Sequence, residues 1–440
     1  MKMFNTGLSF LKLLPGILLM VLAASCINDY GDCPEEDQGD GLIHLSFTVV
    51  TKTVSQSRAD DDCIDDFQGT APEDFMNINN FMFLVYDNGG NFLSDITTKS
   101  HIVTDLSNPD LAIYKVVARL DDPYFTEAVA NPRGNINFSI LVLANYDGWD
   151  AHFPLLQEGQ KIDDIFDDGV VMSTVPDTKR MLEADTDAPD RLCFPMAAVQ
   201  SFSVNPRNLQ NSSEDLPYDI SGGTAVSRYL NLLRAVAKIE VIDKINMAED
   251  AVFTEEDADS PLRITAATLN GYMNKGTLLP ARSQWPANLF VEAATANVTA
   301  PTIPASGAYV RPPALLADNT YGTDFDTDYS LNFAYDAAAT ARRDDKCPVY
   351  SCYVFEYTQG PIPANQQPYV RITTKVSDEY EPANLPMRLA YYTGETPDAN
   401  REFLLRNHIY RYEITGISQE VQFNWTVCPM DGAESNIEFN

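Results

Sequence analysis

Residues 42–50, LIHLSFTVV, alternate between apolar and polar side chains along most of their length. One face of an extended chain carries four apolar residues, Ile43, Leu45, Phe47 and Val49. The opposite face carries the polar residues His44, Ser46 and Thr48. A period of two residues is typical of a half-buried β-strand. This stretch therefore predicts a strand at the start of a β-rich fold.

The same alternation, or an apolar run bounded by turn residues, recurs along the chain at 81–93, 136–148, 368–377, 401–417 and 420–430. Residues 232–245, LLRAVAKIEVIDKI, also alternate, although their alanine and leucine content leaves a helix as the alternative. Many strands, long loops and few helical stretches predict an all-β protein built from stacked antiparallel sandwiches. A length of 440 residues suits two domains better than one.

The first 25 residues have the features of a secretory signal. Lys2 and Lys12 supply positive charge around the apolar run, and small residues precede Cys26. The segment LAASC, residues 22–26, resembles a bacterial lipobox, in which the signal is removed before a cysteine that receives acyl chains. Cys26 is therefore the predicted lipidation site, and an ordinary signal peptide is the alternative. Two or more acyl chains hold a protein on a membrane surface without spanning it.

Residues 26–41 are acidic and poor in apolar side chains, as expected for a flexible tether between the lipid and the folded part. The formal charge is −33, and removal of the signal takes away two lysines and no acid. A net charge this negative argues against nucleic acid and anionic membrane patches as partners. It is consistent with a well-solvated extracellular surface.

The sequence offers little evidence for catalysis or for a metal or cofactor. None of its four histidines has metal-ligand spacing, and no nucleophile elbow or phosphate-binding loop is present. Asp324, Asp326 and Asp328 have the spacing of a calcium loop, but tyrosines stand where that loop needs glycine and glutamate. With Cys26 lipidated, six cysteines remain, which permits disulfides without requiring them. We expect no enzyme, no cofactor and no metal site.

Taken in order, these segments resemble the fimbrillins, the pilus-subunit family of Bacteroidota. The correspondence begins with the lipobox and with a first strand followed by SRA, residues 57–59. The Arg-x-x-Ala-Lys pattern of residues 234–238 and the Arg-Asn-His-x-Tyr pattern of residues 406–410 are the most informative matches. The other matching segments are 78–93, 140–148, 193–204, 267–280 and 423–430, while 284–400 lack a clear match.

The resemblance implies two transthyretin-like antiparallel β-sandwich domains in tandem and an assembly function. After the signal (1–25) and the tether (26–41), we expect an N-terminal domain at 42–280 and a C-terminal domain at 281–440. The subunit would reach the outer membrane and cell surface as a lipoprotein, with other fimbrial subunits as partners. It would serve adhesion or biofilm formation.

The resemblance also implies proteolytic processing by an arginine-specific protease. Arg58 follows the first strand, and no Lys or Arg lies between Arg58 and Lys99. Cleavage would fall between Arg58 and Ala59. The aspartates after Ala59 would slow a trypsin-like enzyme, and an uncleaved anchor subunit is the alternative. The segment GDCPEE, close to the lipid, resembles the same region of anchor subunits, whereas Arg58 stands where stalk or tip subunits are cleaved. The choice between a stalk, a tip and an anchor role therefore stays open.

Cleavage would release the first strand, with Ile43, Leu45, Phe47 and Val49, and leave a groove for a strand from another subunit. The candidate donor strand carries Val421, Phe423, Trp425 and Val427 on one face, and the last residues of the chain, SNIEFN at 435–440, are a second candidate. For the strand at 421–427, an intramolecular edge strand is the alternative. A monomeric surface lipoprotein that binds a glycan or a host protein is the alternative function. Its stacking platform would come from aromatic loop residues: Trp285, Tyr321, Tyr329 and Tyr335.

Overall fold

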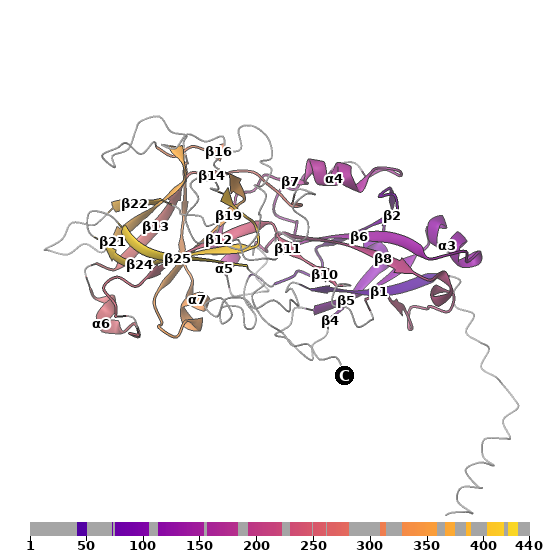
Figure 1. Ribbon diagram of the computed structural model, residues 1–440, viewed down its shortest axis with the longest axis horizontal. Coiled ribbons are helices and arrows are strands. Elements are labelled where there is room, and N and C mark those ends of the chain that lie inside the picture. Colours follow the sequence, from indigo (N-terminus) through magenta and orange to yellow (C-terminus); the bar gives the residue numbers. More distant parts are fainter. Residues whose placement is uncertain are drawn as a thin grey trace, which may run out of the picture.

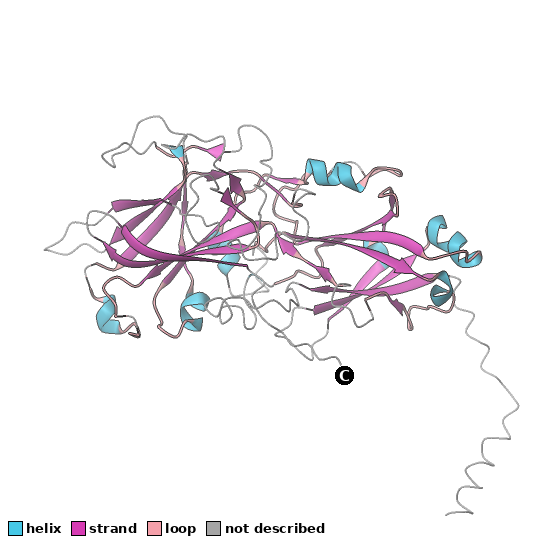
Figure 2. Cartoon of the chain, in the orientation of Figure 1, coloured by secondary structure: helices cyan, strands magenta, loops and turns pink. Residues whose placement is uncertain are grey.

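The described part of the chain is mostly β-strand, with a few short helices (Figure 2). The computed structural model describes residues 42–50, 73, 75–104, 113–153, 156–183, 192–221, 229–248, 250–260, 262–280, 309–313, 328–358, 366–374, 384–388, 403–417 and 421–429. The prediction of an all-β fold is confirmed.

Two five-stranded sheets are formed by the earlier strands (Figure 1). The first sheet has the order β10 (Leu230–Asn231), β1 (Ile43–Val50), β5 (Ile113–Leu120), β4 (Ser100–Thr104), and β9 (Tyr218–Asp219) also pairs with β1. The second has the order β11 (Leu233–Arg234), β8 (Met196–Val204), β6 (Ile136–Ala144), β2 (Phe81–Asp87), β3 (Phe92–Asp95). The rings of Phe47 in β1 and Phe83 in β2 meet edge to face at 5.6 Å, so the two sheets share a core.

Two further sheets are formed by the later strands. The third has the order β18 (Ala334–Tyr335), β19 (Val349–Phe355), β12 (Val236–Asp243), β24 (His408–Ile417), β25 (Val421–Pro429). The fourth has the order β17 (Ser330–Asn332), β13 (Ile264–Asn270), β21 (Tyr369–Thr374), β22 (Asn384–Arg388). The Tyr350 hydroxyl of β19 donates to the Ile264 carbonyl of β13 at 2.9 Å, which joins these two sheets.

The remaining elements are short and lie at the ends of the sheets or between them. The two-stranded pairs are β14 (Tyr272–Met273) with β16 (Tyr309–Val310), β15 (Gly276–Thr277) with β7 (Val171–Met172), and β20 (Tyr357–Thr358) with β23 (Phe403–Leu404). The helices are α3 (Pro123–Ala130), α4 (Ile162–Asp168), α5 (Thr178–Leu182), α6 (Glu255–Ala258), α7 (Ala337–Arg342), η3 (Thr97–Lys99) and η4 (Pro206–Leu209).

The hairpin between β2 and β3 shows how local sequence sets the geometry. The Asp87 carboxylate accepts hydrogen bonds from the backbone N–H groups of Gly89 and Asn91 at 2.7 and 2.8 Å. Gly90 has φ of +74°, a conformation that glycine adopts without steric cost. The turn predicted at residues 88–90 is confirmed.

Residues 232–245 form strands β11 and β12, so the helical alternative is wrong. Their alternation does not mark a solvent-facing side, however, because every residue of β12 is buried. The charged side chains of Lys238 and Glu240 are 1% and 3% exposed. They are tolerated inside the protein because they are paired, as described below.

β11 pairs within the second sheet and β12 pairs within the third, and only Ala235 separates the two strands. The chain therefore passes from the first two sheets to the other two at Ala235. Figure 1 shows the two pairs of sheets at opposite ends of the molecule, with β11 near the middle. The two-domain organisation and its division at residues 280 and 281 stay predictions, and this pairing favours an earlier division, at Ala235. Aromatic contacts connect the two ends: Trp149 to Phe355 at 5.9 Å and Phe194 to Tyr353 at 4.6 Å.

Phe47 should be one of the residues on which stability depends most. Its side chain is fully buried, so Phe47→Ala removes a ring from a packed core and leaves a cavity. We expect a loss of about 3–5 kcal/mol in the free energy of unfolding, measured by urea denaturation. Val103→Ala on β4 is the control, since Val103 is 47% exposed. An equal effect of the two substitutions would contradict the placement of β1 in the core.

Candidate assembly site and its buried anchor

The predicted removable strand is β1, and its four apolar side chains are completely buried. Ile43, Leu45, Phe47 and Val49 are at most 3% exposed. All eight residues of β1 pair antiparallel with β5, from Ile43 opposite Leu120 to Val50 opposite Ile113. On its other side β1 pairs in parallel with the short strands β9 and β10. β1 therefore lies inside its sheet rather than at an edge.

The predicted donor strand is β25, which has a different position. It pairs antiparallel with β24 along its whole length and ends the order of the third sheet. Val421 and Phe423 are partly buried, and the Phe423 ring contacts Tyr412 edge to face at 5.7 Å. Gln422 and Asn424 are exposed. The structure thus brings β25 into an edge strand of its own chain, and it does not bring β25 next to β1.

The predicted lipidation and cleavage positions, Cys26, Arg58 and Ala59, lie outside the described residues. β1 ends at Val50, and the next described residue is Glu73, whose side chain is fully buried. The stretch with the predicted cleavage bond is thus bounded on both sides by buried residues. Among the described residues, no helix is long and apolar enough to cross a bilayer.

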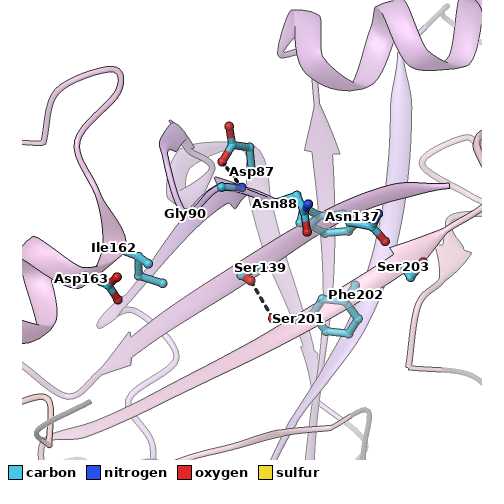
Figure 3. Close-up of a pocket in the computed structure, with 12 residues that line it drawn as sticks. Asp87, Asn88, Gly90, Asn137, Ser139, Ile162, Asp163, Ser201, Phe202 and Ser203 are labelled. Carbon is cyan, nitrogen blue, oxygen red and sulfur yellow. Dashed lines mark hydrogen bonds between the residues drawn. The ribbon is translucent and has the colours of Figure 1, made fainter. Parts of the chain in front are cut away.

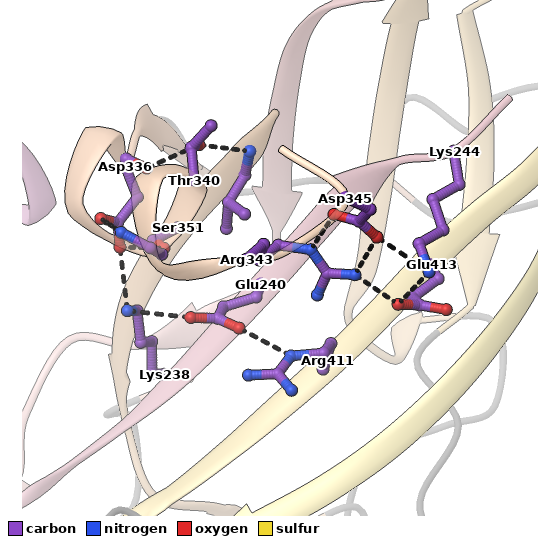
Figure 4. Close-up of polar contacts among 12 residues, drawn as sticks. Lys238, Glu240, Lys244, Asp336, Thr340, Arg343, Asp345, Ser351, Arg411 and Glu413 are labelled. Carbon is purple, nitrogen blue, oxygen red and sulfur yellow. Dashed lines mark hydrogen bonds and ion pairs between the residues drawn. The ribbon is translucent and has the colours of Figure 1, made fainter. Parts of the chain in front are cut away.

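Glu73 belongs to a buried ionic cluster centred on Lys238 of β12. Figure 4 shows Lys238 with two other members of this cluster, Glu240 and Asp336. The Lys238 ammonium group lies 2.8 Å from Glu73, 2.9 Å from Glu240 and 2.9 Å from Asp336. All four side chains are at most 4% exposed. The Tyr353 hydroxyl also donates to Glu73, at 2.5 Å. One amine therefore connects β12 to the segment after β1 and to the residue that precedes α7.

The other partners of these carboxylates complete the cluster. Arg411 of β24 pairs with Glu240 at 3.0 Å, and the Ser351 hydroxyl of β19 donates to Asp336 at 2.8 Å. Asp336 also accepts from the Ala339 backbone N–H at 2.9 Å and so caps α7. A buried charge is tolerated when it is paired and hydrogen-bonded. Three strands of the third sheet are thus joined through side chains as well as through their backbones.

The pKa values of these carboxyl groups reflect their surroundings. Burial alone raises the pKa of Glu73, but the attraction of Lys238 and Arg342 outweighs burial and lowers it to about 2. Burial likewise opposes ionisation of Glu240, and Lys238 and Arg411 lower its pKa to about 2. For Lys238, burial favours the neutral amine, while Asp336 and Glu73 raise its pKa well above the usual range. Glu73, Glu240 and Lys238 are therefore charged at neutral pH.

The two sequence patterns that resemble the fimbrillins meet beside this cluster. The Arg234 guanidinium donates to the Asn407 side-chain oxygen at 3.0 Å and to the Glu73 carbonyl at 2.9 Å. The Asn407 backbone N–H donates to the Val236 carbonyl at 2.8 Å. Arg406 donates to the carbonyls of Leu278 and Thr277 and pairs with Glu356 at 2.8 Å. Both patterns therefore have structural roles at the junction between the two pairs of sheets.

A second ionic cluster lies beside the first and is partly exposed (Figure 4). Arg343 makes two hydrogen bonds to Asp345, at 2.8 and 2.7 Å, and one to Glu413 at 2.8 Å. Lys244 contacts the same two carboxylates at 3.1 and 2.9 Å. These groups tie the loop before β19 to β24.

A polar pocket of about 420 Å³ lies over the second sheet (Figure 3). Its polar lining comes from the β2–β3 turn, β6, β8 and the start of α4: Asn88, Asn137, Ser139, Asp163, Ser201 and Ser203. The hydroxyls of Ser139 and Ser201 bond each other at 2.8 Å. The two aromatic residues of the lining, Phe138 and Phe202, have almost fully buried rings. The pocket thus offers no open aromatic face for a sugar to stack on.

Other predicted site features have structural roles or lie outside the described residues. His44 and His408 are buried, and His408 Nδ1 is 2.8 Å from the Arg406 carbonyl. Tyr335 is 55% exposed, with its ring 6.0 Å from Tyr350, whereas Trp285 and Tyr321 are not described. Cys347 and Cys352 are buried free thiols. Within the described residues, no group of three His, Cys, Asp or Glu side chains is arranged to hold a metal ion.

Removing the central amine should destabilise the fold strongly. Lys238→Met leaves Glu73 and Asp336 buried without their main counter-ion. We expect a loss of about 3–5 kcal/mol in the free energy of unfolding, measured by urea denaturation. Lys99→Met is the control, because the Lys99–Asp121 pair is partly exposed and should contribute less than about 1 kcal/mol. A loss from Lys238→Met no larger than the control would refute the structural role of the cluster.

The same cluster predicts acid sensitivity. The pKa values of Glu73 and Glu240 fall from an ordinary 4.5 to about 2 on folding, so their contribution is complete above pH 4.5. It is lost as the pH falls through the folded values, since the unfolded chain then binds more protons. We expect the free energy of unfolding to decline between pH 4.5 and 2, and Glu240→Gln to flatten the decline. The exposed Glu255→Gln should leave it unchanged; equal curves for both variants would contradict this assignment.

No protein-family model matches the chain, and no curated protein matches it either. Among solved structures, the chain is similar to the C-terminally truncated tip fimbrial protein Mfa3 from Porphyromonas gingivalis, with 14% identity and a TM-score of 0.44 over 88% of this chain and 99% of that one. A fimbrial assembly protein from Parabacteroides distasonis has 12% identity and a TM-score of 0.41 over 89% and 97%. A fimbrilin from Porphyromonas gingivalis has 14% identity and a TM-score of 0.39 over 88% and 96%. These three solved structures are of fimbrial proteins.

Proposed function

We propose that the chain is a structural subunit of cell-surface fimbriae that joins other subunits by exchange of a β-strand. In this proposal cleavage after Arg58 frees β1, and a donor strand with the character of β25 takes its place. The sequence patterns that resemble the fimbrillins support the proposal. The product is an adhesive or biofilm-forming surface structure.

The observation that carries the proposal is a match between β1 and the start of β25. β1 has the sequence IHLSFTVV and β25 begins VQFNWTVC. Aligned without gaps, both have apolar residues at the first and third positions, an aromatic residue at the fifth, threonine at the sixth and valine at the seventh. In strands of period two, this alignment places apolar residues of β25 at the positions of Ile43, Leu45, Phe47 and Val49. β25 of a second copy is therefore a suitable replacement for β1.

The positions of the two strands favour exchange in this direction. A strand at the edge of a sheet leaves by breaking pairs on one side only, and β25 is such a strand. The place of β1 lies between β5 on one side and β9 with β10 on the other, so a strand inserted there gains pairs on both sides. The donor would lie antiparallel to β5, as β1 does.

The stability that the subunit loses when β1 leaves favours binding of a donor strand, and so favours assembly. Burial of each large apolar side chain contributes about 1.5–3 kcal/mol. Loss of β1 would expose the core residues that pack against its four buried side chains, and domain stability is only about 5–15 kcal/mol in total. A subunit without β1 would therefore be unstable until a donor strand fills the gap.

The remaining parts of the proposal concern export and attachment. We propose that residues 1–25 direct secretion, that Cys26 carries the lipid, and that residues 26–41 hold the subunit at the outer membrane surface. An arginine-specific protease would cut between Arg58 and Ala59. The division of the folded part into two domains and the role as stalk, tip or anchor subunit belong to the same proposal.

Protease treatment tests the proposal directly. We expect an arginine-specific protease to cut the purified lipoprotein once near its N-terminus and to produce ladders that resist SDS on electrophoresis. Arg58→Gln should remain a monomer. Phe423→Asp should be cut without forming ladders, because it places a charge on the inward face of β25. Val252→Asp, at a residue that is 55% exposed and lies outside β25, is the control and should still form ladders.

Two outcomes would overturn the proposal. One is clean cutting at Arg58 with no ladder from any variant or mixture of fimbrial subunits. The other is an uncut monomer that binds glycan arrays or host proteins with the same affinity whether or not β25 carries Phe423→Asp. The second outcome would favour the monomeric surface-binding lipoprotein.

A further inference from the structure

The second edge of β1 is covered by residues 205–221, which we call the strap. It contains η4 and β9 and follows β8. The His44 N–H donates to the Ser212 hydroxyl at 3.0 Å, and the Thr48 N–H donates to the Ser221 hydroxyl at 2.8 Å. The Ile220 N–H donates to the Ser46 carbonyl at 2.9 Å. Two side-chain hydroxyls thus stand where a neighbouring strand would place carbonyl groups.

The outer face of β1, which the sequence predicts to be polar and exposed, is buried beside the strap. Phe47 points towards the second sheet, so the even-numbered residues point the other way. His44 is 4% exposed and Ser46 is 0% exposed. Among the described residues the Ser46 hydroxyl has no hydrogen-bond partner. The side chain of Ser46 is thus fully enclosed, and Asp219 of the strap lies beside it as its partner in the pairing of β1 with β9. An enclosed position of this kind admits only a small side chain.

Apart from its bonds to β1, the strap is attached to the protein through apolar side chains. Its buried apolar residues are Pro206, Leu209 and Ile220, and Tyr218 is partly buried against the same core. Gln210 donates to the Val129 carbonyl of α3 at 3.2 Å. Leu216 in the middle of the strap is 73% exposed. Segments with few buried apolar contacts open at lower free energy than the sheets beneath them.

We propose that the strap is the movable wall of the strand-exchange site: it opens when β1 leaves and closes on the strand that enters, which it selects by size at the Ser46 position. This inference rests on the proposed function, because it concerns the same site. The hydroxyls of Ser212 and Ser221 bond backbone N–H groups and so accept a strand of any sequence. Selection comes from the enclosed position, which excludes a bulky side chain.

The proposal defines the chemistry of the preferred partner. The entering segment alternates with period two, with apolar residues at the positions of Ile43, Leu45, Phe47 and Val49. Its residue at the Ser46 position is small. In the β25 alignment that residue is Asn424, which is larger than serine. A β25 strand with Asn424→Ser should therefore enter faster than the natural one.

Hydrogen exchange of the intact, uncleaved chain tests the strap without requiring strand exchange. Ser212→Ala should accelerate exchange of the His44 N–H at least tenfold, and Ser221→Ala that of the Thr48 N–H. Ser213→Ala is the matched control, since its hydroxyl accepts only from Leu216 within the strap. Unchanged exchange at both amides in the Ser212→Ala/Ser221→Ala double variant would overturn the closing role.

Peptide binding to the Arg58-cleaved chain tests the selection. A labelled peptide of residues 42–50 should bind equally well when the peptide carries Ser46→Ala. The same peptide with Ser46→Leu should bind at least thirtyfold more weakly. Equal binding of the Ser46→Leu peptide would overturn selection by the strap. If no peptide binds the cleaved chain, strand exchange itself fails. In that case the hydrogen-exchange rates of the intact variants still report on the strap.

Discussion

The structure depends on one buried amine. Lys238 is almost inaccessible to solvent and is surrounded by Glu73, Glu240 and Asp336. Removing an ammonium group from water is costly, and only close, well-oriented carboxylates offset that cost. The cluster therefore specifies one arrangement of distant segments: the end of the stretch after β1, the central strand of the third sheet, and the hairpin that carries α7. Arg234 and Asn407 add a further connection from the second sheet to β24 at the same place.

This arrangement has a consequence for strand exchange. Glu73 anchors the chain after the predicted cleavage bond independently of β1, so loss of β1 leaves that anchor in place. The junction between the two pairs of sheets is held by charge pairs and aromatic contacts, whereas β1 is held by backbone pairing and by its four apolar side chains. The element proposed to leave and the elements that keep the subunit together thus depend on different interactions. Because the junction does not depend on β1, it can stay in place while the sheet that loses β1 is destabilised and awaits a donor strand.

The sequence predicts local structure well where neighbouring residues decide it. The alternation in residues 42–50 is enough to identify β1, and the Asp87 turn follows from residues within four positions of one another. Prediction from the sequence fails where the interacting residues are far apart in the chain. Polar His44 and Ser46 suggest an exposed face, but Ser212, 168 residues later, accepts the His44 N–H. Likewise the alternating charges of β12 suggest a solvated face, and only the fold shows that Glu73, Asp336 and Arg411 pair with them. The match between β1 and β25 was visible in the sequence, but its meaning required knowing that one strand is enclosed and the other lies at an edge.

A site-specific disulfide tests whether β25 of one subunit occupies the place of β1 in another. In that arrangement Gln422 takes the position of His44, which lies opposite Arg119 of β5. Paired residues of antiparallel strands have Cα atoms about 4.5–5.5 Å apart, within the range of a disulfide. Two single variants, Gln422→Cys and Arg119→Cys, are mixed, cleaved after Arg58 and oxidised. The account predicts a crosslinked heterodimer that forms only after cleavage and only when both variants are present. Failure to crosslink in cleaved, assembled protein, or equal crosslinking by Asn424→Cys in place of Gln422→Cys, would contradict it.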